Sequence, residues 1–348
     1  MRILIVTVRV PFVRGGAEIL AEGLRRVLAG AGHQAEIVAL PFKCYPPERI
    51  LDQMLACRLL DLGETAGMPV DRLIGLRFPA YLIPHPHKVI WIVHQHRQAY
   101  DLWQHPLNDL HTYANGADVR AAIHAADTRL LPQSHGLFTI SRNVSLRLKM
   151  YCGLNAARLY HPPQDAGCFY TRPAEDFLYF PSRINPLKRQ NLVLEALAQT
   201  RSQVRIYFSR PAEEPGFERK CAKLARKDGL ENRVRWLGMV SEEEKRDLYA
   251  RCLGVLFPPL DEDYGYITLE AMLAQKPVIT CTDSGGPLEF VLDHQTGIVA
   301  EPAPDALAAA MDSLWEDRER ARQWGDAGRQ RYDDLHIDWG NVVEKLLA

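Results

Sequence analysis

The chain has 348 residues, of which 47% are apolar and 24% are charged, and its formal net charge is −1. This length suits two globular domains, and no stretch approaches the roughly 18 uninterrupted apolar residues of a membrane-spanning helix. Seven cysteines without paired spacing argue against a disulfide framework or a zinc ribbon. Met1–Val10 reads as a strand rather than a signal peptide, so we expect a cytoplasmic location.

The first half of the chain alternates apolar runs with a helical pattern. Ala17–Ala29 has apolar residues at helical spacing and ends near two glycines. Strands are predicted at Arg2–Val8, Ala35–Leu40, Lys88–Val93 and Gly136–Ile140. Short buried strands that alternate with amphipathic helices predict a parallel sheet covered on both faces.

This alternation stops at His161–Asp165, where two successive prolines suit neither a helix nor a central strand. It then restarts, with strands expected at 177–180, 204–208, 234–237, 253–257 and 277–280 and helices at 191–199, 217–227, 241–250, 267–273 and from about 305. The prediction is an α/β chain with doubly wound domains at 1–165 and 166–328.

The segment 261–274, DEDYGYITLEAMLA, follows a predicted strand and opens a helix. Free N–H groups at the start of a helix can hold an anion, and Gly265 allows close backbone approach. Glu262 and Glu270 flank this start and suit sugar hydroxyls as hydrogen-bond acceptors. The alternatives are a capped helix with solvated acids, or a metal site formed by the D-x-D sequence of Asp261 and Asp263.

Two further loops follow predicted strands of the second domain. Arg183 and Lys188 lie in one of them, at the carboxyl edge of the sheet, where doubly wound folds bind ligands. Two cations there could neutralise a diphosphate, although a charged surface loop is the plain alternative. Gly285 and Gly286 form a second turn that could face a phosphate or a sugar.

The first domain offers a glycine pair and a group of histidines. Gly15 and Gly16 lie where a phosphate loop would, but G-x-G-x-x-G is missing, so no dinucleotide cofactor is expected. His94 and His96 follow a strand, and either could face a reacting centre. A metal site that includes the nearby His85 and His87, or simple packing, are the alternatives.

Charge is divided unevenly along the chain. Residues 1–160 contain 18 Lys and Arg against 12 Asp and Glu, and the remainder contains 24 against 31. The first part is therefore +6 and the second −7. Scattered surface charge is one reading; contact of the N-terminal half with an anionic lipid surface or a lipid-phosphate acceptor is the other. The candidate contacts are Arg14, Arg25, Arg26, Arg72 and Arg77.

Together these segments resemble glycosyltransferase family 4, the retaining GT-B enzymes, over nearly the whole chain and in the right order. The matching residues are Arg183 and Lys188; E-x-[FY]-G-x-x-x-L-E at Glu262, Tyr264, Gly265, Leu269 and Glu270; GG-x-x-E at Gly285, Gly286 and Glu289; GGAE from Gly15 to Glu18; and His94. Asp263 departs from the family, which usually has Gly there.

The resemblance implies two Rossmann-like doubly wound domains that face each other across a cleft, with a C-terminal helix over 329–348 crossing back to the first domain. It places Arg183 and Lys188 on the donor diphosphate, Glu262 and His94 on the donor sugar, and Glu270 on the ribose. The remaining donor-binding positions that it implies are Gly15, Gly16, Met239, Val240, Tyr264, Gly265, Tyr266, Ile267, Thr268 and Leu269.

The implied function is retaining, metal-independent transfer of a sugar from a UDP- or GDP-sugar to a hydroxyl of a glycan or lipid-linked acceptor. Cell-surface polysaccharide, lipopolysaccharide or glycolipid assembly is the expected setting, with possible peripheral membrane contact and no nucleic-acid partner. No cofactor and no metal ion are expected. Two alternatives stay open: a nucleotide-sugar 2-epimerase of similar fold, and a non-catalytic nucleotide-sugar binding module.

Overall fold

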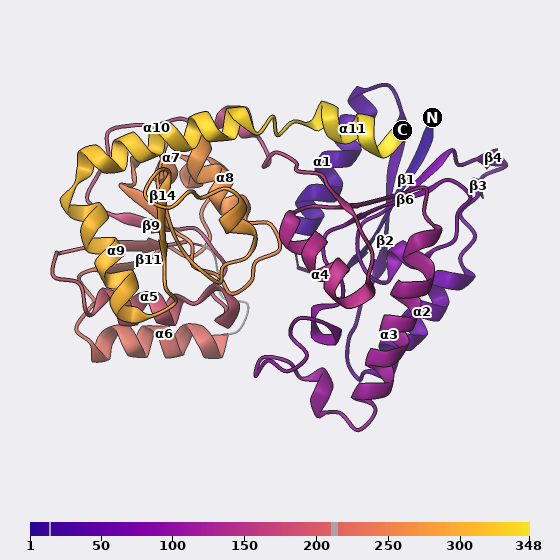
Figure 1. Cartoon of the computed structure of the whole chain (residues 1–348), viewed down its shortest axis with the longest axis horizontal. Coiled ribbons are helices and arrows are strands. Elements are labelled where there is room, and N and C mark those ends of the chain that lie inside the picture. The colour runs from indigo at the N-terminus through magenta and orange to yellow at the C-terminus, as the bar shows by residue number, and fades with distance from the viewer. Residues whose placement is uncertain (14, 210–214) are drawn as a thin grey trace. The chain divides into compact units, whose positions relative to one another are not determined.

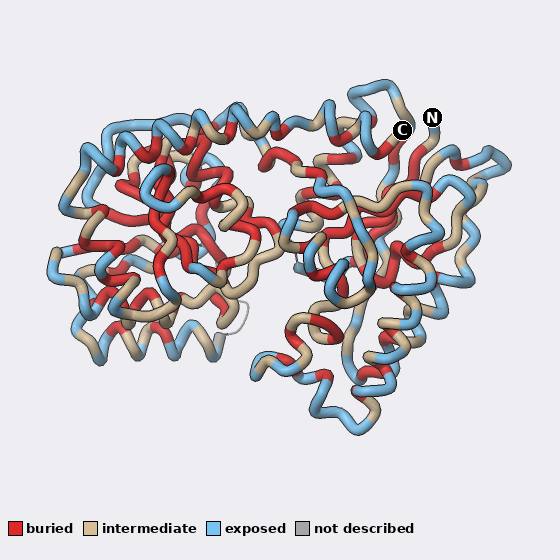
Figure 2. Tube along the Cα trace, in the orientation of Figure 1, coloured by how far each residue is buried: buried red, intermediate tan, exposed pale blue. Residues whose placement is uncertain are grey.

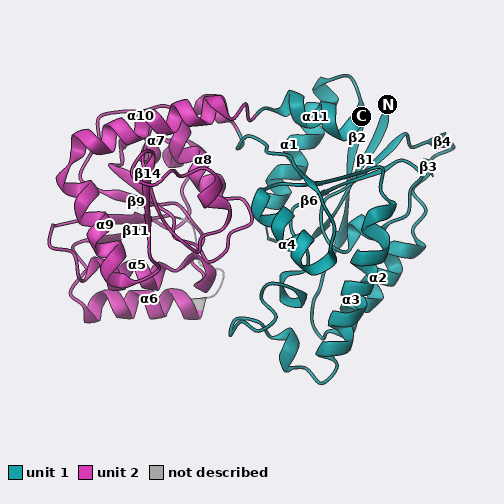
Figure 3. Cartoon of the chain, in the orientation of Figure 1, with its two compact units in different colours: residues 1–164, 338–348 teal, residues 165–337 magenta. Residues whose placement is uncertain are grey.

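The computed structural model describes residues 1–13, 15–209 and 215–348 and divides the chain into two compact units (Figures 1 and 3). Unit 1 consists of Met1–Gln164 together with Asp338–Ala348, and unit 2 of Asp165–Ile337. The chain therefore passes from one unit to the other twice. Arg14, one of the candidate membrane contacts, lies outside the described residues.

Unit 1 is built on a parallel sheet in the order β2-β1-β5-β6-β7-β8. Strand order reverses between β1 and β5, and α1, α2, α3 and α4 connect or flank the strands. The bounds are β1 Arg2–Arg9, α1 Gly16–Gly30, β2 Gln34–Pro41, α2 Glu48–Leu59, β5 Arg72–Gly75, β6 Lys88–Ile92, α3 Gly116–Leu130, β7 Gly136–Thr139, α4 Arg142–Cys152 and β8 Ala157–Arg158; a short hairpin pairs β3 (Glu64–Thr65) with β4 (Met68–Pro69).

Unit 2 has a parallel sheet in the order β11-β10-β9-β12-β13-β14. Counted along this unit, the order is 3-2-1-4-5-6, which is that of the dinucleotide-binding fold, and it reverses between β9 and β12. The predicted doubly wound α/β architecture is confirmed. The strands are β9 Leu178–Phe180, β10 Ile206–Phe208, β11 Val234–Trp236, β12 Gly254–Leu256, β13 Val278–Cys281 and β14 Gly297–Ala300.

Helices cover both faces of the second sheet, whose strands form the buried centre of the unit (Figure 2). Leu178 and Phe180 of β9 belong to a buried cluster shared with α5, α6 and α9. Between them, Tyr179 points to the opposite face, because successive strand side chains alternate, and its ring meets Tyr249 of α7 at 5.1 Å. The helices are α5 Gln190–Leu197, α6 Pro215–Lys227, α7 Glu242–Arg251, α8 Tyr266–Leu273 and α9 Pro304–Glu316.

The C-terminal segment differs from the single helix expected over 329–348. Helix α10 (Arg318–Asp334) stays in unit 2, and α11 (Trp339–Leu347) belongs to unit 1. The helix is interrupted because His336 adopts a positive φ of 47°, and Asp338 then caps α11 by accepting the N–H of Asn341 at 2.8 Å. Val342 and Leu346 of α11 are fully buried in unit 1.

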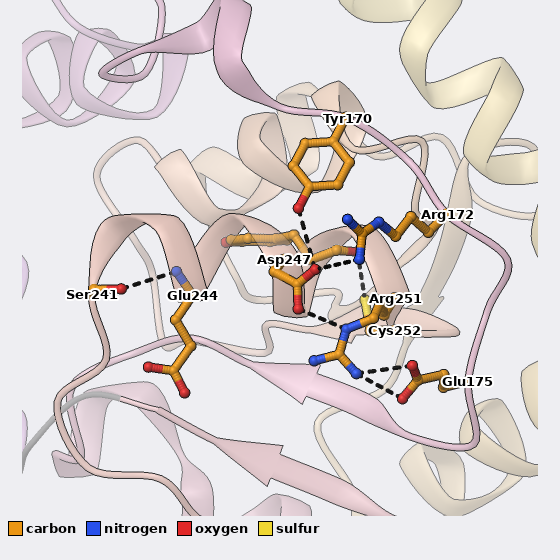
Figure 4. A network of polar contacts seen from close by, with 9 residues as sticks. Tyr170, Arg172, Glu175, Ser241, Glu244, Asp247, Arg251 and Cys252 are labelled. Atoms are coloured by element: carbon orange, nitrogen blue, oxygen red, sulfur yellow. Dashed lines mark hydrogen bonds and ion pairs between the residues drawn. The ribbon is translucent and has the colours of Figure 1, made fainter.

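A charged network fastens the first residues of unit 2 to α7 (Figure 4). Asp247 accepts hydrogen bonds from Tyr170 (3.2 Å), Arg172 (3.0 Å) and Arg251 (2.7 Å), and Arg251 also binds Glu175 at 2.8 Å. Ser241 caps the same helix by accepting the N–H of Glu244 at 3.0 Å. These contacts are partly exposed, so each contributes little alone, but together they fix the helix that carries Lys245 and Tyr249.

A buried carboxyl organises unit 1 near the end of β6. Asp127 of α3 is fully buried and accepts hydrogen bonds from Tyr81 (3.0 Å), Gln95 (2.9 Å) and Tyr100 (2.8 Å). Burial raises the pKa of Asp127 to about 6, against the opposing effect of these three donors. The segment that contains His94 is thereby tied to α3 through Gln95.

This raised pKa predicts a pH dependence of stability. The folded chain binds a proton on Asp127 more tightly than the unfolded chain, so the stability from this group is fully present below about pH 4 and is lost as the pH rises through about 6. Chemical denaturation of Asp127→Asn should lack this component, whose slope is at most about 1.4 kcal/mol per pH unit. Parallel slopes in the wild type and the variant would contradict the assignment.

Candidate functional site: three loops at the switch point of unit 2

Three loops meet at the carboxyl edge of the second sheet, beside the point where strand order reverses. They follow β9 (181–189), β12 (257–265) and β13 (282–286). At such a reversal the connections from adjacent strands leave toward opposite faces, which opens a crevice for a ligand. The two cations and the glycines of the sequence motifs in the second domain fall on these loops, and the motif of the second loop continues into α8.

Two ion pairs join the loops through their side chains. Lys188 Nζ donates to Glu262 Oε2 across the switch point, and its ammonium also lies 5.5 Å from the centre of the Phe257 ring. Arg189 forms two parallel hydrogen bonds with Asp283, at 2.7 and 2.6 Å. Lys188, predicted to bind the diphosphate, and Glu262, predicted to bind the donor sugar, are thus brought together. Their opposite charges form an ion pair in this structure.

Backbone hydrogen bonds hold the same loops in register. Leu260 N donates to Leu187 O at 2.8 Å, and Asp261 N donates to Asp283 O at 2.9 Å. Glu262 exchanges bonds with the third loop: its N–H donates to Ser284 O at 2.9 Å, and its carbonyl accepts from Gly286 at 2.8 Å. The position of the Glu262 carboxylate is therefore set by backbone on both sides.

The glycines at 265 and 286 are required by close packing between two loops. Gly265 has a φ of 91° and precedes α8, and a Cβ on Gly286 would lie 2.5 Å from the carbonyl oxygen of Tyr264. A Cβ on Gly265 would come within 3.0 Å of Pro287. The sequence suggested that Gly265 lets a ligand approach, whereas the structure shows the backbone approached by the neighbouring loop.

Glu270 is buried near the middle of α8, with both carboxylate oxygens engaged. Lys245 Nζ donates to Oε1 at 2.9 Å and Tyr249 OH to Oε2 at 2.7 Å. Burial alone would lower the pKa of Lys245, but the carboxylates of Glu270 and Glu242 outweigh burial and raise it. Each carboxylate oxygen has a second lone pair, so this arrangement leaves capacity for a ligand hydroxyl.

The other predicted donor-binding residues of unit 2 surround the start of α8 or follow β11. Arg183 is half-buried in the loop after β9, and its carbonyl accepts a hydrogen bond from Gln190 at 2.9 Å. Met239 is 67% exposed, and Val240 beside it is buried. Thr268 is fully buried, and its hydroxyl has no hydrogen-bond partner among the described residues. The set is completed by two buried residues, Tyr264 and Leu269, and two half-buried ones, Tyr266 and Ile267.

The predicted residues of unit 1 lie at the carboxyl ends of β1 and β6. Gly15 is the N-cap of α1, where Glu18 accepts its N–H at 2.8 Å and also pairs with Arg77 at 3.1 Å. Gly16 is the first residue of that helix. His94 is half-buried, and its Nδ1 lies 2.7 Å from the carbonyl oxygen of Gln95.

His96 differs from His94 in its surroundings. Its ring packs against Phe42 and Phe78, with centroids 6.0 and 5.7 Å away, and burial lowers the pKa of His96 to about 4. His85 and His87 precede β6, at the opposite end of that strand from His94 and His96. The described residues contain no group of three or more His, Cys, Asp or Glu placed to hold a metal ion.

Sequence reasoning missed the residues that support the motif side chains. Arg189 and Asp283 adjoin recognised motifs, so the opposite charges beside Lys188 and Gly285 were a usable signal. Lys245 and Tyr249 are four residues apart on α7 and share one helix face. Nothing in the sequence connects that face with Glu270, because the contact depends on how α7 and α8 cover the sheet.

The contact between Gly286 and Tyr264 generates a test. Gly286→Ala should destabilise unit 2 by roughly 1–3 kcal/mol, because the new methyl group meets backbone that the β12 loop holds in place. Gly216→Ala, on α6 with nothing within 4 Å of the new Cβ, is the matched control and should be neutral or slightly stabilising. Equal melting temperatures for the two variants would contradict the tight packing.

Two doubly wound parallel sheets, the second with charged loops at its switch point, define the GT-B class of folds. The solved structure of Anabaena HepE in complex with UDP-glucose supports the class: it superposes with a TM-score of 0.70, at 17% identity, over 100% of this chain and 98% of that one.

Residues 171–331, which lie within unit 2, match the family model described as glycosyl transferases group 1. The alpha-1,3/1,6-mannosyltransferase ALG2 of Dictyostelium discoideum is 38% identical over 110 residues, 32% of this chain and 26% of that protein. The O-antigen chain mannosyltransferase C of Escherichia coli is 27% identical over 186 residues, 53% and 48% of the two chains. The matched segments thus span between a quarter and about half the length of these curated relatives.

Proposed function

We propose that this protein is a retaining glycosyltransferase that moves a sugar from a nucleoside diphosphate sugar to a hydroxyl of a glycan or lipid-linked acceptor. The observation that carries the proposal is the Lys188–Glu262 pair at the switch point of unit 2. A cation for a diphosphate and a carboxylate for sugar hydroxyls stand side by side there, next to the N-terminus of α8.

In this mechanism the charges of the crevice act on the leaving group. Lys188 and Arg183 would stabilise the negative charge that develops on the departing diphosphate, and the first N–H groups of α8 would contribute further donors. When Lys188 leaves Glu262 to bind the diphosphate, the Glu262 carboxylate would accept hydrogen bonds from the donor sugar. Glu270 would hold the ribose, and His94 would contact the donor sugar.

The names of the relatives guide the choice of donor. Both curated relatives are mannosyltransferases, and the HepE structure contains UDP-glucose. A nucleotide-activated mannose is therefore the first donor to test, followed by UDP-glucose. Because these names describe transferases, they favour sugar transfer over the epimerase hypothesis and over the binding-module hypothesis.

The acceptor proposal rests on the charge of the N-terminal half and extends to an anionic membrane surface. Arg25 is exposed and suits such a contact, but Arg77 is paired with Glu18 and Arg72 donates to Leu347 O at 2.9 Å. These two arginines serve the packing of unit 1. None of the helices that the structure describes is long and apolar enough to cross a membrane.

The first functional test removes the two basic side chains that are proposed to bind the donor diphosphate. Lys188→Ala and Arg183→Ala should each abolish transfer and weaken nucleoside diphosphate binding by about 1.5–3 kcal/mol, the scale of a charge-assisted hydrogen bond. Lys227→Ala, at the exposed end of α6, is the control for loss of charge. Calorimetric titration with UDP and GDP measures the effect, and wild-type affinity and turnover in both site variants would refute the site.

The role of metal ions is tested separately. The basic side chains and the helix N-terminus supply the positive charge in this proposal, so transfer should continue in excess EDTA. Loss of activity in EDTA that manganese or magnesium restores would assign Asp261 and Asp263 to a metal site instead.

The stereochemical outcome provides an independent test. The glycosidic bond formed should keep the anomeric configuration of the donor, and proton NMR of the product at early times measures this directly. An inverted product would exclude the retaining mechanism, even if the donor site were correct.

A further inference from the structure

Unit 1 contains a polar cavity at the end of its sheet opposite to His94. The cavity has a volume of about 500 Å³ and lies where β6 begins and α2 ends. Its lining comprises Arg58, Leu59, Leu60, Asp61, Gly63, Pro84, His85, Pro86, Lys88 and Gln133. Because β6 separates it from the segment with His94, this cavity is not part of the proposed catalytic machinery.

Two cations converge in the cavity on one short turn. Lys88 is only 4% exposed, and its Nζ donates to the carbonyl oxygens of Tyr81 and Ile83, both at 3.1 Å. Arg58 donates through Nη1 to the carbonyl between them, that of Leu82, at 2.8 Å. The carbonyls of three successive residues, from Tyr81 to Ile83 at the end of η1 (Ala80–Leu82), therefore accept hydrogen bonds from the two head groups.

No full negative charge compensates these two cations within the described part of the chain. Neither Lys88 nor Arg58 forms an ion pair there, and the one acidic residue of the lining, Asp61, is exposed and accepts the N–H of Gly63 at 2.9 Å. An ammonium group has three donors, and the described residues supply acceptors for two of those on Lys88. Arg58 is exposed, but Lys88 is buried, and a buried charge with only carbonyl dipoles around it is costly unless a counter-ion completes the site.

We propose that this cavity binds the phosphate group of a phosphorylated compound, through Lys88 and Arg58. A phosphate has several acceptor oxygens, so it can accept from the ammonium and the guanidinium together. The cavity is larger than a phosphate ion and within the usual size range of small-molecule sites, so the remaining volume suits an organic group esterified to it. Leu59, Leu60 and Pro84 provide apolar surface for that group.

The histidine of the cavity is not a further anion ligand. His85 Nε2 lies 3.1 Å from Val70 O, and its Nδ1 accepts the N–H of His87 at 3.0 Å. Both ring nitrogens are therefore engaged by backbone groups, and burial lowers the pKa of His85, which favours the neutral ring. The binding charge comes from Lys88 and Arg58.

Binding of inorganic phosphate to the intact protein tests the proposal. Calorimetric titration and thermal denaturation at constant ionic strength should detect binding to the wild type. Lys88→Met and Arg58→Gln should each weaken binding by about tenfold or more, the equivalent of one charge-assisted hydrogen bond. Lys149→Gln, an exposed cation of α4 away from the cavity lining, should bind phosphate like the wild type.

The phosphate-dependent change within each variant is the decisive quantity, because it is independent of the intrinsic stability of that variant. Absence of phosphate binding to the wild type would overturn the proposal. So would equal phosphate effects in all four proteins, which would indicate a general salt effect. Glycosyl transfer need not change in these variants, so failure here is distinct from failure of the catalytic proposal.

A pH series adds a readout that a purely structural lysine would not give. Burial and the neighbouring Arg58 lower the pKa of Lys88 to about 8, so wild-type phosphate affinity should fall as the pH rises above about 8. The other charged or titratable side chains of the cavity lining are Arg58, Asp61 and His85, and burial favours the neutral ring of His85 by lowering its pKa. A pH-independent affinity above pH 8 would contradict the role of Lys88.

The source of the phosphate is decided by a parallel experiment. Phosphatidylcholine vesicles with and without phosphatidic acid are sedimented with the wild type and with Lys88→Met. Binding that requires both phosphatidic acid and Lys88 assigns the site to a lipid headgroup. Binding of free phosphate without Lys88-dependent sedimentation assigns it to a soluble phosphorylated compound.

Discussion

The reversal of strand order between β9 and β12 is the constraint on which the candidate site depends. Adjacent parallel strands whose connections leave toward opposite faces cannot close the space above their ends. The loops after β9, β12 and β13 meet at that space, and seven of their residues form backbone hydrogen bonds from one loop to another. The charged side chains are therefore placed by the sheet and the loop backbones, before any ligand arrives.

Within this frame, the Lys188–Glu262 pair gives the crevice its chemical character. In the structure each charge satisfies the other, which limits the cost of holding both in a partly buried place. A diphosphate can replace Glu262 as the partner of Lys188, and that exchange leaves the carboxylate to a sugar. Arg189 and Asp283 form a separate pair, so the loops can stay joined while the first pair opens.

The sequence predicted the second unit better than the first, for physical reasons. Strands β1 and β9 are nearly uninterrupted apolar runs, and Pro181 ends the run of β9, so both are visible in the sequence. Helices α2 and α3 were not predicted, because ERILDQMLACRL and GADVRAAIHAADTRL have weak apolar faces and bury only a few residues. Strand β5 was missed because only two of its four residues, Leu73 and Ile74, are large and apolar, so no apolar run marks it.

The motif residues were predictable because their spacing follows from a strand, a loop and a helix start. Their partners were not. Lys245 and Tyr249 reach Glu270, and Arg189 reaches Asp283, only through tertiary contacts between elements far apart in sequence. The cavity of unit 1 that contains Arg58 and Lys88 was not predicted, for the same reason. In the sequence these two residues resemble ordinary surface charges, and only the turn after β5 brings them together.

A crystal structure with a bound nucleoside diphosphate tests the central claim most directly. The account predicts that the diphosphate lies over the switch point of unit 2, within hydrogen-bond distance of Lys188 Nζ, with Glu262 no longer paired to that ammonium and the Arg189–Asp283 pair intact. A diphosphate bound elsewhere on the chain, with Lys188 still paired to Glu262, would contradict it.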